Sequence, residues 1–585
     1  MTPSFGPVLL APGRTRFRLW APASEQVGLV VDGAAPVPMT AGADGWHTAE
    51  HACGPGAQYR FQVNPDLLVP DPGSRAQAGD VHDASIVTDP GAYRWQHPDW
   101  SGRPWHEAVI YELHVGALGG FKGVTEWLPH LAALGVTAVE LMPVADFPGT
   151  RNWGYDGVLP YAPDAAYGTP DELKRLVDAA HGLGLMVMLD VVYNHFGPDG
   201  NYQAGYAPAL YRGDRSTPWG DAIDFRRAPV QRYFIENALY WVQEFRMDGL
   251  RFDAVHAIDD SEYLMALAAE IRAAEPGRHI HLVLENENND AGLLRGTPLV
   301  PGYDAQWADD LHHCVHVLLT GEAEGYYAHF QAAPAEQLAR CLAEGFAFQG
   351  ETRDDGVARG TPSAHLPPTA FVVCLQNHDQ IGNRAMGDRL TVLADPAGLR
   401  AATVLLLLAP QIPLLFMGQE WASRTPFLYF CSHTGELADA VLAGRRREFA
   451  AFAHFAEPEI RETIPDPNAE TTFRASIPDR AEIAGDDRNA WLELHRHLLH
   501  LRATVIAPRI PGAASLSARA LGAAGVLAVW RMGDGAVLAM AVNLGADAVP
   551  LPEMQGRMLF ETSPASPDGR LPGRAAVVRL LEQVA

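Results

Sequence analysis

Basic residues are scarce in this chain relative to acidic ones. Lys and Arg together number 44 against 70 Asp and Glu, which gives a formal net charge of −26 at pH 7. Such a surface repels phosphate backbones and anionic membranes, so we expect neither a nucleic-acid partner nor a membrane partner. A neutral substrate such as a glucan is indifferent to this charge.

Cysteine and long apolar runs are also rare. The cysteines are five in number, show no CxxC spacing and read as reduced, mostly buried thiols: Cys53, Cys314, Cys341, Cys374 and Cys431. The most apolar stretch, VLLLLAPQIPLLFMG, is interrupted by Pro410, Gln411 and Pro413. The start, MTPSFGPVLLAPG, lacks the basic segment and apolar run of a secretion signal. We therefore expect a cytoplasmic monomer.

What is present indicates several domains. The chain has 585 residues, which predicts about two to four domains. From Thr15 to Val63, short alternating runs (TRFRLW, VGLVV, YRFQV) separated by turn residues are typical of a small antiparallel sandwich. The last part repeats this style around a turn at Met532–Gly535. We predict an N-terminal β-sandwich over 1–95, a catalytic unit over 96–505 and a C-terminal β-sandwich over 506–585.

The middle of the chain alternates apolar strand candidates with helical patterns, which indicates βα units and a parallel sheet. One helix carries a complete start signal, with Thr169 as N-cap, Pro170 in the first turn and Glu172 as capping-box partner. The strand candidates are AVIYELHV, VTAVELMPV, LMVMLDVV, DGLRFDAV, HIHLVLE, YDAQW, FVVCLQN and IPLLFM. Eight such units favour a closed α/β fold, the (β/α)8 TIM barrel, over an open sheet. The long, polar stretch from His195 to Phe225 reads as a binding excursion.

Polar residues end four of these apolar strands, and in such a barrel the active site lies at the C-terminal strand ends. The four groups are Asp190 to His195, Arg251 with Asp253, Glu285, and Gln376 to Asp379. Taken singly, each has an ordinary explanation: a buried ion pair for Arg251 and Asp253, a helix cap for Glu285, a surface acid for Asp379 and a rim hydrogen bond for His195. Their convergence on one barrel end favours catalysis.

Two carboxyl groups in different environments suit glycoside hydrolysis, in which one attacks the anomeric carbon and the other protonates the departing oxygen. An arginine two residues before Asp253 points to the same side of the strand and would keep that carboxylate ionised. Glu285 ends an apolar strand, where burial would raise its pKa and hold it protonated as an acid.

The segments DVVYNH, GLRFDAVH, LVLEN and LQNHDQ closely resemble, in order, the four signature segments of the alpha-amylase family of glycoside hydrolases. The resemblance implies a retaining mechanism with Asp253 as nucleophile, Glu285 as acid and then base, and Asp379 as transition-state stabiliser. It also implies a set of sugar-binding or supporting residues: Tyr155, Asp190, His195, Arg251, His256 and His378. Of these, Tyr155 would stack on the sugar. His256 stands at the position where many amylases carry a lysine that contacts the leaving-group side of the substrate.

Further stretches, among them FPGTRNWGYDGVLPYAP, TPWGDAIDF, DAQWADDLHH and LLFMGQEW, are similar to a group within that family. Its members hydrolyse the α-1,4 bond next to the terminal trehalose unit of malto-oligosyltrehalose and release trehalose and a malto-oligosaccharide. Trehalose is a bent disaccharide, and aromatic rings would stack on it. The candidates, each weighed against core packing, are Trp219, Trp307, Phe346 and Phe348.

Besides His256, one further departure from the family pattern and several alternatives remain. After Glu285 the run Asn286 to Asp290 differs from the Ser-Asp-Leu-Asn-Asp type expected, and Glu287 is a competing carboxylate. A glycogen branching enzyme, a debranching or amylase-type hydrolase and an inactive barrel used for binding are the alternatives. The mechanism needs no cofactor, and we expect none. The spacing of His312, His313, Cys314 and His316 fits no standard metal site, and Asp309 to Leu319 is predicted to be an ordinary loop and helix. Asn194 lacks identifiable calcium co-ligands.

Overall fold

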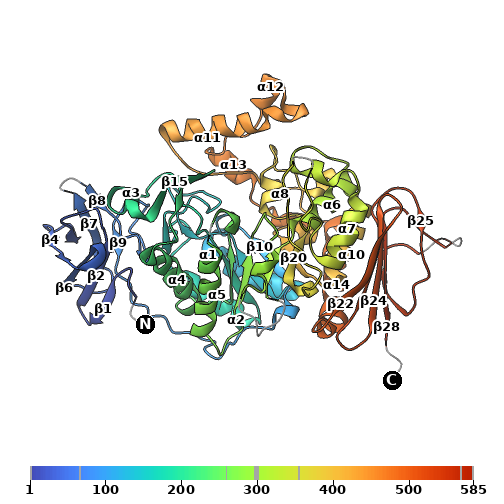
Figure 1. Cartoon of the computed structure of the whole chain (residues 1–585), viewed down its shortest axis with the longest axis horizontal. Coiled ribbons are helices and arrows are strands. Elements are labelled where there is room, and N and C mark those ends of the chain that lie inside the picture. The colour runs from blue at the N-terminus through green and yellow to red at the C-terminus, as the bar shows by residue number, and fades with distance from the viewer. Residues whose placement is uncertain are drawn as a thin grey trace.

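The computed structural model describes residues 3–64, 67–258, 260–295, 302–353, 356–564, 566 and 569–582. A β-sheet region lies at one end of the molecule, a barrel surrounded by helices lies in the middle, and a second β-sheet region lies at the other end (Figure 1). Among the described residues, none of the helices has the length and apolar character needed to cross a membrane. All five cysteines are free, and four are buried, as predicted.

The N-terminal region pairs two antiparallel sheets, which confirms the predicted sandwich. One has the order β1 (Val8–Ala11), β2 (Arg14–Trp20), β6 (Trp46–His51), β5 (Thr40–Ala41). The other has the order β4 (Val37–Pro38), β3 (Gly28–Val31), β7 (Gln58–Asn64), β8 (Leu67–Val69), with β9 (Ser85–Ile86) on β7. Alternate residues of β2 and β7 are buried, so that Phe17 and Tyr59 meet with ring centroids 4.7 Å apart.

The central region is a closed barrel of eight parallel strands, and each of the eight predicted runs supplies one strand. The strands are buried throughout, which explains why their sequences are continuously apolar rather than alternating. In order around the barrel they are β10 (Ile110–Leu113), β11 (Ala138–Leu141), β14 (Met186–Val191), β17 (Gly249–Phe252), β18 (His281–Leu284), β19 (Ala305–Trp307), β20 (Phe371–Cys374) and β21 (Ile412–Phe416). Pairing of β10 with β21 closes the ring.

Helices surround the barrel, and their starts follow local signals. Helix α2 begins at Pro170 after a complete capping box between Thr169 and Glu172, as predicted. The helices of the chain are α1 (Gly120–Leu134), α2 (Pro170–Gly182), α3 (Gln203–Tyr206), α4 (Ala228–Gln243), α5 (Ser261–Ala274), α6 (Asp309–Thr320), α7 (Pro334–Glu344), α8 (His378–Gly382), α9 (Leu390–Leu393), α10 (Pro396–Leu408), α11 (Gly435–Glu448), α12 (Pro458–Arg461), α13 (Glu470–Ala475) and α14 (Asp486–Leu501).

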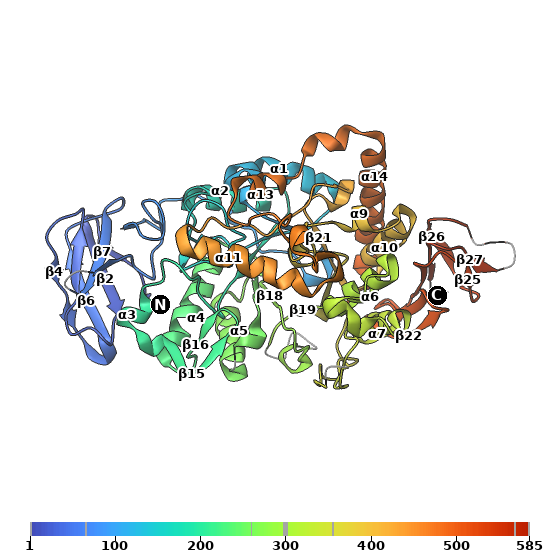
Figure 2. The same cartoon turned by 90° about the horizontal axis from the view of Figure 1, so that it is seen from above.

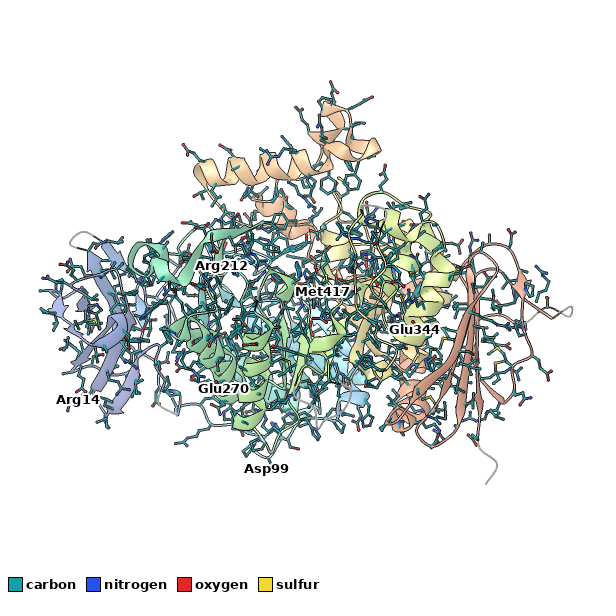
Figure 3. The ribbon with its side chains drawn as sticks, in the orientation of Figure 1. Arg14, Asp99, Arg212, Glu270, Glu344 and Met417 are labelled. Carbon is teal, nitrogen blue, oxygen red and sulfur yellow. The ribbon has the colours of Figure 1, made fainter. Side chains whose placement is uncertain are left out.

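Long connections gather at one end of the barrel. The predicted excursion contains α3 and a hairpin of β15 (Tyr211–Thr217) and β16 (Gly220–Ile223), and a shorter pair, β12 (Ala145–Asp146) with β13 (Leu159–Pro163), follows β11. Figure 1 places α11 on the same side of the barrel as β15 of this hairpin and α8, and Figure 2, seen from above, shows α11 in front of the barrel. In Figure 3 the labelled Arg212 lies on the hairpin, while Met417, directly after β21, lies near the centre of the molecule.

The C-terminal region is a five-stranded antiparallel sheet with a two-stranded companion. The large sheet has the order β22 (Ala514–Leu521), β23 (Gly525–Arg531), β24 (Val537–Asn543), β28 (Ala575–Leu581), β26 (Arg557–Glu561), and β25 (Val549–Pro550) pairs with β27 (Arg570–Leu571). The predicted turn at Met532–Gly535 joins β23 to β24. The domain limits 1–95, 96–505 and 506–585 stay predictions.

Candidate active site

A cavity of about 480 Å³ opens at the C-terminal ends of the barrel strands. Asp253 directly follows β17, Glu285 directly follows β18, and Asp379 lies in the first turn of α8 after β20. All three carboxyl groups line this cavity. The three acids are far apart in the sequence. They lie close together because the C-terminal ends of parallel barrel strands meet at one end of the barrel. Other predicted residues on the lining are Tyr155, His195, Trp219, His256 and His378.

Arg251 lies beneath this cavity and contacts three carboxylates. Its Nη1 lies 2.7 Å from Asp190 Oδ2 and 2.9 Å from Asp253 Oδ1, and its Nη2 lies 2.9 Å from Glu285 Oε2. The Arg251 side chain is fully buried, and neither it nor Asp190 lines the cavity. The family resemblance implies a sugar-binding role for Arg251 and a supporting one for Asp190. The structure places both residues beneath the carboxyl groups of Asp253 and Glu285, which Arg251 contacts directly.

The protonation of the carboxyl pair differs from the prediction. Burial and the neighbouring Glu285 carboxylate raise the pKa of Asp253 well above its usual range, although Arg251 opposes this shift. Burial also acts on Glu285, but Arg251 and the Ala254 backbone amide lower its pKa. These directions are opposite to the prediction of a raised pKa at Glu285 and of an Asp253 that Arg251 keeps ionised, because Arg251 reaches both carboxylates rather than Asp253 alone.

A strained turn links the two carboxyl groups. Ala254, directly after Asp253, has a φ of 40°, a conformation that is costly for a residue with a Cβ atom. Its N–H donates to Glu285 Oε2 over 2.8 Å, and the Val255 N–H donates to the Glu285 carbonyl over 3.0 Å. The strain therefore serves to aim a backbone donor at the Glu285 carboxylate.

His378 connects Asp379 to the barrel interior. Its Nδ1 donates to Glu112 Oε1, its Nε2 lies 2.9 Å from the Tyr155 hydroxyl, and the same nitrogen lies 3.4 Å from Asp379 Oδ2. Burial lowers the pKa of a histidine, but the Asp379 and Glu112 carboxylates outweigh it and raise the pKa of His378 to about 10. His378 is thus an imidazolium at neutral pH. Tyr155 stacks on its ring, with centroids 5.2 Å apart, and donates its hydroxyl proton to Asp190 over 2.7 Å.

Trp219 and His195 form one wall of the cavity. Their rings stack with centroids 5.1 Å apart and an interplanar angle of 14°. Trp219 lies at the turn between β15 and β16 and is 46% exposed, so one face of a large aromatic ring is open to a ligand. His195 Nε2 is held at 2.9 Å from the Tyr155 carbonyl oxygen. The hairpin thus carries an available aromatic platform to the catalytic cavity.

The other three aromatic candidates do not line this cavity. Phe346 is fully buried against Phe371, with ring centroids 5.1 Å apart. Trp307 is buried at the end of β19, where its ring lies 4.1 Å from the Arg251 guanidinium carbon. Phe348 is half-buried and packs edge-on behind Phe330. Core packing accounts for Phe346 and Trp307, which are buried. The half-buried Phe348 lies outside the lining of this cavity, and its role as a binding residue stays a prediction.

Several residues on the cavity were not predicted. Asp309 lies at the start of α6 and lines the cavity, and burial with the negative charges of Glu285 and Asp379 raises its pKa to about 7. It follows the end of β19 after one residue, so its place at the C-terminal end of a predicted strand could have marked it as a site residue. His313, which we read as part of an ordinary helix, also lines the cavity. Further unpredicted lining residues are Tyr326, His329, Phe330, Arg353, Arg359, Gln380 and Asn383.

The remaining histidines of α6 have protein partners. His312 contacts the Leu375 carbonyl and the Tyr327 hydroxyl, and His316 lies 2.8 Å from Glu322. Within the described part of the chain, no group of three or more His, Cys, Asp and Glu side chains is placed to hold a metal ion. Glu287 lines the rim, but its nearest cation partner is His256 at 3.9 Å, and it lacks the contacts that hold Glu285.

Comparison with known proteins gives consistent results. The model of the alpha amylase catalytic domain matches residues 83–208, and that of a domain of unknown function, DUF3459, matches residues 513–578. A malto-oligosyltrehalose trehalohydrolase from Deinococcus radiodurans is 44% identical over 83% of this chain and 81% of its own length. Another from Rhizobium sp. is 41% identical over 84% of this chain and 85% of its own length.

Solved structures show the same architecture. The crystal structure of a putative alpha amylase from Salmonella typhimurium has a TM-score of 0.95 and 44% sequence identity, and the match covers 100% of both chains. A pullulanase from Paenibacillus barengoltzii has a TM-score of 0.70 at 22% identity, covering 99% of this chain and 94% of its own. The second likeness supports the arrangement of the fold alone.

Proposed function

The chain belongs to the malto-oligosyltrehalose trehalohydrolases of the alpha-amylase family of glycoside hydrolases, and we propose that Asp253, Glu285 and Asp379 perform its reaction. In this reaction water cleaves the α-1,4 bond next to the terminal trehalose unit of malto-oligosyltrehalose. The observation that carries the assignment is the meeting of these three carboxyl groups around one cavity, two of them on a single buried guanidinium.

The proposed cycle has two displacements. Asp253 attacks the anomeric carbon of the glucose unit that precedes trehalose, while Glu285 gives its proton to the glycosidic oxygen, so that trehalose leaves as a neutral alcohol. Glu285 then takes a proton from water, whose oxygen displaces Asp253 and releases the malto-oligosaccharide. Both carboxyl groups return to their starting states, and the product keeps the α configuration.

The two carboxyl groups act as a coupled pair in this cycle. Two interacting carboxyl groups take up protons as a pair, and the cycle needs a total of one proton on Asp253 and Glu285 together. Arg251 and the Ala254 amide lower the pKa of Glu285, whereas burial and the Glu285 carboxylate raise the pKa of Asp253. The proposed cycle requires the proton of the pair on Glu285 when substrate is bound, because the glycosidic oxygen accepts a hydrogen bond only from a protonated Glu285.

Asp379 and His378 would bind the sugar at the cleavage point. The Asp379 carboxylate is one-third exposed to the cavity, and its pKa is raised by burial but lowered by the adjacent His378 imidazolium. An ionised Asp379, the form that the adjacent His378 favours, can bind sugar hydroxyl groups and stabilise the positive charge that develops at the anomeric centre. Tyr155 would stack on the same sugar ring.

Trp219 is the proposed platform for the trehalose side. It is the member of the four aromatic candidates that lines the cavity. Its ring face, held by the stack with His195, offers an apolar surface to a compact disaccharide. His256, on the same cavity, is proposed to contact the leaving side.

We also propose a cytoplasmic, monomeric enzyme. The free cysteines, four of which are buried, support a reducing compartment. Size-exclusion chromatography with light scattering tests the oligomeric state, for which a mass of 63.4 kDa is expected. A mass of twice this value would contradict the monomer.

Product analysis tests the reaction. Purified enzyme is incubated separately with maltotriosyl-trehalose and with maltopentaose, and the Glu285→Gln variant serves as the control for contaminating activity. Rapid release of trehalose with slow or no attack on maltopentaose is the expected result. Comparable attack on both substrates would identify an amylase, and new α-1,6 branches in amylose without free trehalose would identify a branching enzyme.

A further inference from the structure

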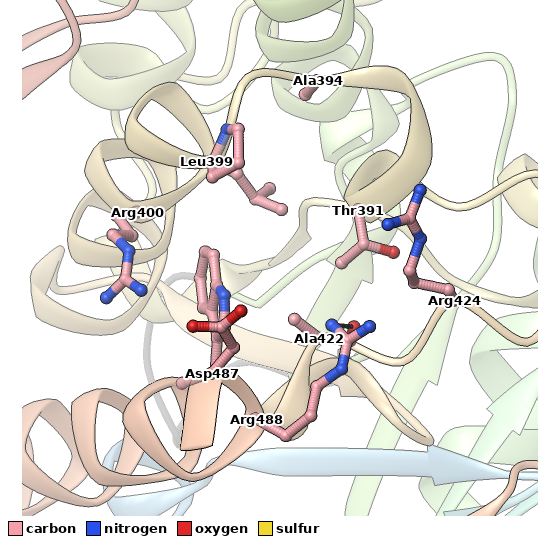
Figure 4. Close-up of a pocket in the computed structure, with 10 residues that line it drawn as sticks. Thr391, Ala394, Leu399, Arg400, Ala422, Arg424, Asp487 and Arg488 are labelled. Atoms are coloured by element: carbon pink, nitrogen blue, oxygen red, sulfur yellow. Dashed lines mark hydrogen bonds between the residues drawn. The ribbon is translucent and has the colours of Figure 1, made fainter. Parts of the chain in front are cut away.

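A second cavity, of about 400 Å³, lies outside the catalytic site. It is bordered by the end of α9, the start of α10, the segment after β21 and the start of α14, and it shares no lining residue with the catalytic cavity. Three arginines line it, with Arg424 and Arg488 drawn on one side of the pocket and Arg400 on the other (Figure 4). Such a concentration of positive charge is unexpected in a chain with a net charge of −26.

The arginines are poorly neutralised by the protein. Among the described residues, Arg400 and Arg424 have neither a hydrogen-bond partner nor an ion-pair partner, and Arg488 donates only to the Ala422 carbonyl. The carboxylate on the lining is Asp487. Two other nearby acids are engaged elsewhere, since Asp395 pairs with Arg574 at 3.1 Å and Glu482 accepts hydrogen bonds from Trp421 and Ser423.

The start of α14 does not add to this positive charge. The helix has 16 residues, and its first turn carries two acids, Asp486 and Asp487, which offset the positive end of the helix dipole. The positive charge of the cavity therefore comes from the three guanidinium groups.

The rest of the lining indicates the size and character of the ligand. Trp491 and Leu399 give the cavity an apolar wall, and its volume exceeds that of an inorganic anion but suits a small ring compound. Trp491 is only 7% exposed, and the Arg400 guanidinium carbon lies 4.6 Å from its ring centroid. The covered ring offers no open face for a neutral glucan chain, so the charged groups dominate recognition.

We propose that this cavity binds a phosphate monoester carried on a single sugar-sized ring. Arginine matches phosphate oxygens with paired N–H donors, and Arg424 and Arg488 supply this part of the site. The ring would lie beside Leu399 and the small exposed part of Trp491, without stacking on the indole face that Arg400 covers. A sugar phosphate and a nucleoside monophosphate share this chemistry, and a titration distinguishes them.

Isothermal titration calorimetry of the full chain at low salt tests the proposal, with glucose 6-phosphate, adenosine monophosphate, inorganic phosphate and maltose as probes. One monoester is expected to bind saturably in the millimolar range or tighter, and the preferred one identifies the ring. Arg424→Gln and Arg488→Gln should each weaken it about 10-fold, the amount that loss of one charge-assisted hydrogen bond produces. Both variants should keep full hydrolytic activity, because neither residue touches the catalytic cavity.

Arg496→Gln is the matched control. Arg496 lies on α14 outside the cavity, where it pairs with Glu493 at 2.6 Å, and its replacement should leave binding unchanged. Should Arg488→Gln fail to fold, the exposed Arg424 remains as a test site. Absence of saturable binding up to about 20 mM would overturn the proposal. So would an equal affinity for inorganic phosphate, binding of maltose alone, or an affinity that Arg424→Gln leaves unchanged.

Discussion

Replacing Glu112 by glutamine removes the carboxylate that holds His378 in its charged form. Both side chains are 1% exposed, and His378 Nδ1 donates to Glu112 Oε1. Glutamine has the same shape and can still accept this hydrogen bond, but it carries no charge. Glu112 Oε2 also accepts a hydrogen bond from the His378 backbone N–H over 3.2 Å, which the amide nitrogen of glutamine cannot do. The substitution therefore removes the charge of Glu112 together with one hydrogen bond, and it lowers the pKa of His378, which is about 10 in the intact protein.

The expected loss of folding free energy follows from the size of the pKa shift that the Glu112 charge causes at His378. An opposite charge at hydrogen-bond distance shifts a pKa by about 1 to 3 units, so a fall of about 2 units, to about 8, is expected. At about 1.4 kcal/mol per unit, the variant should lose about 3 kcal/mol of folding free energy at pH 7. Since the folded pKa of His378 lies above its unfolded value, the contribution is complete below about pH 6.5 and is lost as the pH rises through the folded pKa.

Two measurements check this prediction. Urea unfolding as a function of pH should show stability falling between about pH 6.5 and 10 in the parent protein, and over a narrower range ending near about pH 8 in Glu112→Gln. The alkaline limb of kcat/KM should move to lower pH by about 2 units, because an uncharged His378 no longer places a positive charge beside Asp379 and the sugar-binding groups of the cavity. Glu336→Gln, at an exposed position on α7, is the control. An unchanged alkaline limb together with an unchanged pH dependence of unfolding would refute the reasoning.

Three further predictions concern the assigned residues. Asp253→Ala and Glu285→Gln should each reduce kcat by about 10³-fold or more with the fold preserved by circular dichroism, and an active, folded Asp253→Ala would overturn the nucleophile assignment. Trp219→Ala should lower kcat/KM for maltotriosyl-trehalose much more than kcat/KM for a plain maltodextrin. An equal loss of kcat/KM on both substrates would contradict the proposed contact between Trp219 and trehalose. Phe346→Ala should lower the unfolding free energy by about 3 to 5 kcal/mol through loss of its packing on Phe371 and leave the ratio of the two substrates unchanged; a changed ratio would restore it as a binding residue.

The barrel could be predicted because its signal is local and repeated. Each strand is buried on both faces, so its sequence is a short apolar run, and the polar residues that end such runs lie at one end of a parallel barrel. This was sufficient to place Asp253, Glu285 and Asp379 together. It was also sufficient for Asp309, which follows β19 in the same way but was read as part of an ordinary helix start.

What could not be predicted depends on the direction of side chains in space. Trp219 and Phe346 are both aromatic residues near polar segments, yet one lies on a hairpin turn facing the cavity and the other lies under α7 in the core. No periodicity in their neighbourhoods separates these outcomes. The protonation of Glu285 was mispredicted for a similar reason, because the reach of Arg251 across two strands is a property of the folded barrel.

The role of Glu112 could be predicted only in part from the sequence. It is a single acid within the strand run AVIYELHV, and its partner His378 is 266 residues away in the sequence. An acid inside a buried strand needs a partner, so the sequence could have indicated that one exists. It could not have indicated that the partner is a histidine of the catalytic cavity.

Time-resolved proton NMR of the intact enzyme acting on maltotriosyl-trehalose tests the central claim most directly, because one spectrum reports both the bond cleaved and the configuration of the new anomeric centre. The proposed roles of Asp253 and Glu285 predict that trehalose and the α-anomer of maltotriose appear first, and that the β-anomer follows only through mutarotation. Initial formation of β-maltotriose, or release of glucose in place of trehalose, would contradict the account.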